Sequence, residues 1–354
     1  MTSSQFELSS PPSDAVSAVA FSPTSPTRLL VSSWDKNVYL YDTHAQPGGA
    51  LLQTFEHRAP VLDVCFGAND NEAFTAGLDW DVKRIDLETG EQTVLSSHNG
   101  GVKSVLYSKE RSILISASWD CTMHIHQLSD ATKEPATIPL PSKPFSLSLT
   151  ATKLVVAMAS RALHIYDIQA LSLVSSQSSQ PPPNILEVEP WQRREPSLKF
   201  MTRAVACMPN DAGYASSSIE GRVAVEWFDP SAESQARKYA FKCHRQPSST
   251  GDGVDVVYPV NALAFHPVFD GNFASGGGDG IVALWDGVAK RRIRQYQRYP
   301  ASIAALAFSS NGRYLAVASC PGFEDGKEDL DALDQTKVYI RELGETEAKG
   351  KGSK

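Results

Sequence analysis

Three cations near the middle of the chain could bind an anion. Arg222 follows a Glu-Gly pair, and Lys242 and Arg245 lie within one Lys-Cys-His-Arg run. The chain carries a net charge of −7, so a compact positive spot would stand out on an acidic protein. It would suit phosphate or carboxylate, because charge-assisted hydrogen bonds contribute about 1.5 to 3 kcal/mol each. A solvated basic rim is the alternative.

Three tryptophans could anchor a bound polypeptide. Trp34 and Trp119 each immediately precede an aspartate that marks a tight turn, and Trp80 immediately follows one. Indoles beside tight turns tend to be only partly covered, and several on one rim would form the aromatic anchor that protein-binding sites use. Packing of each indole between neighbouring sheets is the alternative.

One set of residues has the composition of a hydrolase triad: His98, Ser116 and Asp120. However, His98 precedes Asp120 by 22 residues, and His57 precedes Asp79 by the same interval. The recurrence of this spacing and the lack of a nucleophile-elbow motif favour a structural role. We expect each histidine to hydrogen-bond its turn aspartate.

Two further histidines, His124 and His126, share one face of a predicted strand and could hold a metal. No third ligand lies nearby in sequence, so a half-exposed strand is the favoured interpretation. Phosphate-loop, esterase and metalloprotease motifs are absent from the sequence. We therefore predict no catalytic residue, no metal site and no cofactor.

A repeat must position these residues. Six stretches share an apolar-x-x-apolar-x-Phe pattern or a near variant, beginning at residues 16, 61, 102, 145, 260 and 303. Most copies continue with a second strand rich in small residues, an acidic turn residue and a short alternating strand. A period of about 40 to 45 residues is typical of four-stranded propeller blades.

The seventh copy starts at Arg203, where the other copies have Val, Phe or Ile. Burying an unpaired guanidinium is costly, so Arg203 should face a carboxylate or solvent at the end of its strand. An intramolecular salt bridge is the alternative to a partner contact.

Seven copies predict an all-β fold, a seven-bladed β-propeller of WD repeats. The last copy has only three strands, and an open blade would leave an unpaired edge. We expect residues Gln5–Ser9 to supply the missing strand, so that the ring is closed by the N-terminal strand completing the last blade. The predicted domains are a propeller over residues 1–345 and a flexible tail over 346–354.

Departures from the period mark loops. The polar, proline-rich segment Ser175–Asn184 is expected to be flexible or extended. Gln246–Asp255 and Pro321–Gln335 are expected to be further loops. We expect no helix of any length, because no segment shows helical periodicity.

Composition and charge exclude several classes of protein. The acidic overall charge argues against non-specific nucleic-acid binding, and no run approaches the ~18 to 20 apolar residues of a membrane span. Five widely spaced cysteines include no C-x-x-C pair, which favours a reducing compartment. We expect a monomeric intracellular protein.

Several runs of the sequence resemble a known family, the spindle-checkpoint WD-repeat family of the third "budding uninhibited by benzimidazole" protein. The resemblance covers nearly all of residues 5–343. It is carried by Ser217–Glu226, Lys238–Arg245, Tyr258–Ala262, Leu30–Asp35 and Arg298–Ala304. A sister family, the mRNA-export propeller that binds a nucleoporin, shares the Glu-Gly-Arg-Val-Ala and Lys-Cys-His-Arg runs. Val225–Pro230 and the Arg-Tyr-Pro-x-Ser-Ile stretch favour the checkpoint family.

The resemblance implies a non-enzymatic adaptor of the mitotic spindle checkpoint. Its top face would bind GLEBS segments of a checkpoint kinase and a kinase-like checkpoint protein. Trp34, Trp119 and Arg203 would contact the GLEBS segment, with Arg203 pairing with one of its glutamates. Arg222 and Lys242 would contact the phosphothreonine of Met-Glu-Leu-Thr repeats in a phosphorylated kinetochore scaffold.

The resemblance also implies an indirect link to the anaphase-promoting complex. The expected location is the nucleus, at the kinetochore in mitosis, with the cytoplasm as a further location, and neither membrane nor direct nucleic-acid binding is expected. The alternative function is that of the sister propeller in mRNA export. An enzyme with its active site at the channel mouth is disfavoured, since the inner-strand residues are mostly Ala, Val and Ser.

Overall fold

The computed structural model describes residues 4–44, 48–129, 133–177, 186–248, 253–322 and 335–350. These residues form seven four-stranded antiparallel sheets, the blades of a seven-bladed β-propeller, as the repeat predicted. The chain divides into two compact units, which we name the 17–195 unit (Ser17–Glu195) and the second unit (Met1–Val16 with Pro196–Lys354).

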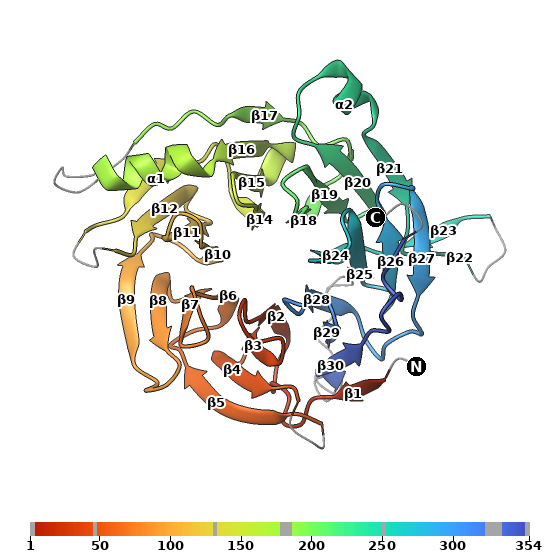
Figure 1. Cartoon of the computed structure of the whole chain (residues 1–354), viewed down its shortest axis with the longest axis horizontal. Helices are drawn as coiled ribbons and strands as arrows, with labels where there is room; N and C mark the ends of the chain where they lie inside the picture. Colours follow the sequence, from red (N-terminus) through yellow and green to blue (C-terminus); the bar gives the residue numbers. More distant parts are fainter. Residues whose placement is uncertain are drawn as a thin grey trace. The chain divides into compact units, whose positions relative to one another are not determined.

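Four blades belong to the 17–195 unit, and the first strand of each lies on the concave side of that unit (Figure 1). Their strands are β2 (Val16–Phe21), β3 (Arg28–Ser33), β4 (Asn37–Asp42) and β5 (Ala50–Glu56); β6 (Val61–Phe66), β7 (Glu72–Gly77), β8 (Asp81–Asp86) and β9 (Gln92–Ser97); β10 (Val102–Ser108), β11 (Ile113–Ser118), β12 (Thr122–Gln127) and β13 (Ala136–Pro139); β14 (Pro144–Leu149), β15 (Lys153–Met158), β16 (Leu163–Asp167) and β17 (Gln192–Arg194).

Three blades and a two-stranded hairpin belong to the second unit. The blades are β18 (Thr202–Cys207), β19 (Gly213–Ser218), β20 (Arg222–Trp227) and β21 (Tyr239–Lys242); β24 (Val260–Phe265), β25 (Asn272–Gly277), β26 (Val282–Asp286) and β27 (Arg291–Gln295); β28 (Ile303–Phe308), β29 (Tyr314–Ser319), β30 (Lys337–Glu342) and β1 (Gln5–Glu7). The hairpin joins β22 (Arg245–Pro247) to β23 (Asp255–Val257).

Small side chains on the second strand of most blades let the sheets pack closely. Ser32, Ser116 and Ser217 are completely buried in β3, β11 and β19. Their hydroxyl groups are satisfied locally: Ser217 Oγ donates to the carbonyl of Val260 at 2.8 Å. Such bonds offset the cost of burying a polar group between the sheets.

The N-terminal strand completes the last blade, as predicted. β1 pairs antiparallel with β30, placing Phe6 opposite Ile340. The pairing continues beyond β1, because the amide of Leu8 donates to the carbonyl of Val338 at 2.8 Å. The Leu8 side chain is buried, so this segment contributes apolar packing as well as backbone hydrogen bonds.

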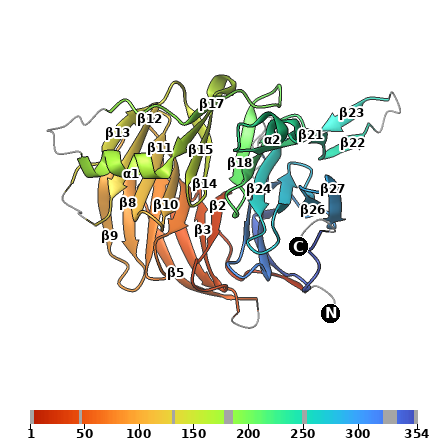
Figure 2. The same cartoon turned by 45° about the horizontal axis from the view of Figure 1, so that its top comes forward.

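Two local predictions were wrong. The chain contains helices α1 (Ile168–Gln177) and α2 (Ala232–Ala236) and a 3₁₀ turn, η1 (Ala159–Arg161). Part of the expected loop after Arg245 is the β22–β23 hairpin, which stands out from the sheets of the second unit (Figure 2). Residues 178–184 of the proline-rich segment and 323–334 of the last expected loop lie outside the described residues.

The C-terminal segment also differs from expectation over residues 346–350, where a flexible tail was predicted. Glu347 accepts hydrogen bonds from Arg294 and from the Tyr296 hydroxyl, both at 2.9 Å. The buried Ala348 offers its carbonyl to Asn272 at 2.8 Å. These polar contacts hold a segment that lacks large apolar residues. Residues 351–354 lie outside the described part of the chain.

Replacing Leu8 with alanine should destabilise the protein by about 2 to 5 kcal/mol, because a buried leucine is removed from the completed blade. Glu7→Gln is the matched control, since Glu7 forms only a partly exposed ion pair with Lys337. Chemical denaturation of the full chain measures both variants. Equal unfolding midpoints for Leu8→Ala and the wild-type chain would contradict a structural role for this segment.

Candidate functional site

The turns between the second and third strands carry most of the candidate residues. In five blades, one residue of this turn has a positive φ: Lys36 (73°), Trp80 (70°), Cys121 (67°), Gly221 (65°) and Gly280 (71°). The carbonyl of each accepts a hydrogen bond of 2.8 to 2.9 Å from a backbone amide in the segment just after the outer strand of its blade. The turn is therefore fixed to the outer strand, and the side chains beside it project from the edge of the blade.

The structure brings the two predicted phosphate-binding residues together. Arg222 begins β20 and lies directly opposite Lys242, the last residue of β21. Gly221 is needed between Glu220 and Arg222, because a Cβ there would lie 2.7 Å from the carbonyl oxygen of Cys243. Lys242 is exposed, whereas Arg222 is partly covered and lies 3.5 Å from Glu220.

A cationic hollow continues from Lys242. It has a volume of about 320 Å³, and its lining includes the four cations Lys242, Arg245, Arg292 and Arg298. The one carboxylate in the lining, Asp279, is buried and hydrogen-bonded to His244 at 2.9 Å. Cations therefore outnumber carboxylates in the lining four to one, which favours an anionic ligand. The sequence pattern indicated Lys242 and Arg245 but not Arg292 and Arg298, which come from β27 and the segment after it.

Cys243 also lines this hollow, so a thiolate nucleophile beside the cations must be considered. Burial raises the pKa of the Cys243 thiol to about 12. The thiol is therefore protonated at neutral pH, and a protonated thiol is a poor nucleophile. The hollow is therefore suited to binding an anion, and its thiol is not activated for nucleophilic attack on a bound ligand.

Within the 17–195 unit, the structure leaves Trp34 and Trp119 partly accessible. Trp34 is 40% exposed, and the Trp119 indole is half-buried. Trp119 packs on Gly101, where a Cβ would lie 2.9 Å from Cε3 of the indole. Packing against the backbone covers one part of the ring and leaves the rest available to a partner.

Arg203 belongs to the second unit, and its side chain is exposed at the start of β18. Its Nε donates to Oδ1 of Asn261 at 3.0 Å. Among the described residues Arg203 forms no ion pair, so the structure does not support the intramolecular salt bridge that the sequence left open. The guanidinium is positioned by an amide and can accept a carboxylate from outside.

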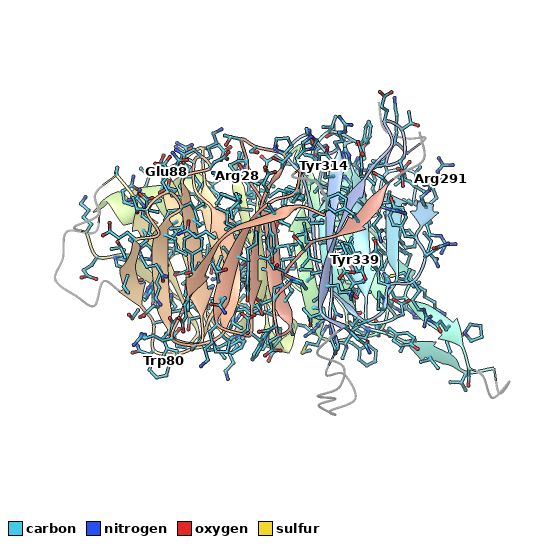
Figure 3. The ribbon with its side chains drawn as sticks, turned by 90° about the horizontal axis from the view of Figure 1, so that it is seen from below. Arg28, Trp80, Glu88, Arg291, Tyr314 and Tyr339 are labelled. Atoms are coloured by element: carbon cyan, nitrogen blue, oxygen red, sulfur yellow. The ribbon has the colours of Figure 1, made fainter. Side chains whose placement is uncertain are left out.

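Trp80 is the most exposed of the three turn tryptophans, at 52%. Its left-handed backbone costs a non-glycine residue roughly 1 to 2 kcal/mol. Figure 3 places Trp80 at the edge of the 17–195 unit opposite Arg28 and Glu88. Trp34 lies at that same edge, because it follows the end of β3 that is distant from Arg28.

The residues that resembled a hydrolase triad do come together, in a buried network. His98 Nε2 lies 2.9 Å from Ser116 Oγ, and His98 Nδ1 lies 3.5 Å from Asp120. Ser116 is fully buried and cannot meet a substrate. The equivalent network in the second unit is His244 with Ser275 and Asp279, at 2.8 and 2.9 Å. This recurrence supports the structural interpretation.

The expected bond between His57 and Asp79 is absent from the described structure. His57 instead contacts Thr75 Oγ1 at 2.9 Å and the carbonyl of Phe55 at 3.1 Å. Asp79 forms a buried ion pair with Lys83 at 2.6 Å. The prediction was wrong for this blade because Lys83, four residues after Asp79, supplies a stronger partner than a neutral imidazole.

His124 and His126 are buried, not half-exposed as predicted. The His98 and His124 rings stack with centroids 3.6 Å apart, and Ser96 Oγ lies 3.2 Å from both His124 and His126. Burial lowers the pKa of His98 to about 4 and those of His124 and His126 to about 3. Across the described residues, no group of three or more His, Cys, Asp or Glu side chains could hold a metal.

The fold and its displayed side chains define a class of protein: a WD-repeat propeller with aromatic and cationic groups at its blade edges. The model of the family "WD domain, G-beta repeat" matches residues 3–42, 90–127 and 256–286. Within the described residues, no helix is long and apolar enough to span a bilayer.

Comparison with curated proteins narrows the class to one family. The chain is 44% identical to mitotic checkpoint protein BUB3.1 of Arabidopsis thaliana, over 98% of this chain and 94% of that protein. It is 38% identical to mitotic checkpoint protein bub3 of Dictyostelium discoideum, over 93% of this chain and 92% of that protein. It is 29% identical to the poly(A)+ RNA export protein of Schizosaccharomyces pombe, over 98% of this chain and 93% of that protein.

The chain therefore belongs to the BUB3 family of WD-repeat mitotic checkpoint proteins. Members of this family are non-enzymatic adaptors, which agrees with the sequence-based prediction of an adaptor.

The buried histidines predict acid sensitivity. Unfolded imidazoles bind protons near pH 6.5, whereas His98 and His124 stay neutral in the folded chain down to about pH 4 and about pH 3. Their contribution to stability is thus complete above about pH 6.5 and is lost as the pH falls toward 4. His124→Gln should make this loss shallower in denaturant titrations at pH 7, 6, 5 and 4.5. The exposed His44 gives the control, His44→Gln. A slope in His124→Gln as steep as in the control would contradict the assignment.

Proposed function

We propose that this chain is a two-site adaptor of the spindle checkpoint. One site, at the blade edges, holds the GLEBS segment of a checkpoint kinase or kinase-like checkpoint protein. The other reads phosphothreonine in Met-Glu-Leu-Thr repeats of the kinetochore scaffold. The chain then acts in the nucleus and at the mitotic kinetochore, and its link to the anaphase-promoting complex is indirect.

The observation that carries the proposal is the cross-strand pairing of Arg222 with Lys242, which also lines the cationic hollow. A phosphothreonine carries a charge of about −1.5 to −2 and three acceptor oxygens. The Arg222 guanidinium and the Lys242 ammonium can both donate to one phosphate, because cross-strand neighbours lie about 5 Å apart. An unphosphorylated threonine offers neither the charge nor these acceptors, so phosphorylation acts as the switch.

The GLEBS site is supported by exposed groups in each unit. Trp34 and Trp119 offer apolar surface, and Arg203 offers a guanidinium without an ion-pair partner among the described residues. Aromatic and arginine side chains are the groups that most often dominate protein–protein binding energies. A segment that combines apolar and glutamate side chains matches both kinds of group.

The sister role in mRNA export and nucleoporin binding is the alternative function. Higher identity to the checkpoint relatives, 44% and 38% against 29% for the export protein, favours the checkpoint role. Affinity capture of the full chain from mitotic cells discriminates the two. Recovery of a nucleoporin without any checkpoint kinase would contradict the proposal.

The phosphate site is tested with the double variant Arg222→Ala, Lys242→Ala. Loss of two charge-assisted hydrogen bonds should weaken binding of a phosphorylated Met-Glu-Leu-Thr peptide by about 100-fold or more in calorimetry. Binding of a GLEBS peptide should change less than about threefold, because the double variant leaves Trp34, Trp119 and Arg203 in place.

A matched control removes the same charge elsewhere on the second unit. Lys238 and Arg291 are both exposed. Lys238 immediately precedes β21, at the end of that strand opposite Lys242, and Arg291 begins β27. The variant Lys238→Ala, Arg291→Ala should keep wild-type affinity for the phosphopeptide. Equal losses in the two double variants would show a general charge effect and refute the assignment of Arg222 and Lys242.

A further inference from the structure

Trp80 combines a strained backbone with an exposed indole. In the fifth and sixth blades, glycine fills the equivalent turn position, where φ lies between 65° and 71°. Trp80 has the same conformation, with φ of 70°, and a bulky side chain that disfavours it. The indole is 52% exposed and forms no ring stacking, cation–π contact or side-chain hydrogen bond with the described residues. The fold itself therefore gains little from tryptophan at this position.

The turn that carries Trp80 lies beneath an exposed arginine, Arg58. Arg58 donates to the carbonyl of Asp79 at 3.4 Å and pairs with Asp81 at 2.6 Å, so its guanidinium lies over the turn that carries Trp80. The Arg58 side chain is nevertheless 71% exposed. A hollow of about 690 Å³ opens beside Arg58, and the exposed Val94 contributes to its wall.

We propose that Trp80 and Arg58 form a specificity subsite for an acidic peptide, with the indole receiving an apolar side chain and Arg58 a neighbouring carboxylate. The inference rests on the proposed GLEBS site and extends it along the edge of the 17–195 unit. The occupant is the GLEBS segment proposed above to contact Trp34 and Trp119, which carries glutamate side chains.

The exposed cations Arg58 and Lys36 favour this occupant over a basic or purely apolar one. Lys36 is exposed in the turn of the first blade, next to Trp34, as Arg58 is beside Trp80. Arg58 thus lies close to Trp80 in the structure, and Lys36 lies two residues after Trp34 in the sequence. An apolar residue flanked by carboxylates would cover an indole and meet a cation at each of the two turns.

A binding role and a structural role for Trp80 predict opposite changes in unfolding temperature and in peptide affinity when the residue is replaced. Replacing Trp80 with glycine relieves the left-handed strain, so the full chain should unfold at an equal or higher temperature than wild type. The same change removes the indole, so affinity for a GLEBS peptide should fall about 10- to 30-fold. A structural tryptophan would give the opposite result, with lower stability and unchanged affinity.

The experiment measures GLEBS-peptide affinity by calorimetry and unfolding by calorimetric scanning for Trp80→Gly and Trp80→Asn. Asparagine also tolerates the left-handed conformation, so the second variant removes the indole without glycine's added backbone freedom. The control is Trp191→Ala, because Trp191 is 44% exposed in the same unit but contacts Lys153 and lies next to the outer strand β17. It should keep wild-type affinity.

The outcomes distinguish this inference from the proposed function. If the wild-type chain fails to bind the GLEBS peptide, the proposed function itself is wrong. If the wild-type chain binds and both Trp80 variants bind equally well, the GLEBS site stands and the Trp80 subsite is overturned. Weaker binding in both Trp80 variants, with wild-type affinity in Trp191→Ala, supports the subsite.

Discussion

One backbone hydrogen bond, repeated in five blades, determines where the functional side chains lie. It joins the carbonyl of the left-handed turn residue to an amide in the segment just after the outer strand, as between Gly221 and Cys243 at 2.9 Å or Trp80 and His98 at 2.9 Å. The bond holds the tight turn against the outer strand. Residues on either side of it, such as Arg222 and Lys242, are consequently neighbours although 20 positions separate them in sequence.

The same constraint separates polar groups that stabilise the fold from those that can bind a partner. Histidines below the turns are buried and bond to serine or threonine hydroxyls, as His98 does to Ser116. Burial lowers the pKa of His98 to about 4, so its imidazole is neutral at pH 7. Tryptophans and cations at the turns are left partly or fully accessible. The interior network contains the elements of a hydrolase triad, but Ser116 is fully buried, so the network stabilises the fold.

The fold could be predicted from sequence because the repeat is encoded locally. The apolar-x-x-apolar-x-Phe copies mark the first strands, and the missing strand of the last blade indicated β1. The helix α1 was missed because its buried apolar face is short, with Ile168 and Leu171 as its fully buried residues. The segment at Glu347 was missed because its contacts are polar. Polar contacts depend on tertiary neighbours that no local pattern shows.

The site was only partly predictable for the same reason. Arg222, Lys242 and Arg245 stand near each other in a recognisable run, whereas Arg292 and Arg298 reach the hollow from another blade. The expected hydrogen bond between His57 and Asp79 is not formed, because Lys83 pairs with the Asp79 carboxylate instead. Trp80 was noticed in the sequence, but its strain and exposure emerged only from the backbone geometry.

The central claim is that two polypeptides bind this chain at separate surfaces. It is tested most directly by titrating phosphorylated Met-Glu-Leu-Thr peptide into the full chain already saturated with GLEBS peptide. The account predicts that the phosphopeptide binds with one-to-one stoichiometry and releases no GLEBS peptide. Displacement of the GLEBS peptide by the phosphopeptide would mean that the two share one surface, and would contradict the account.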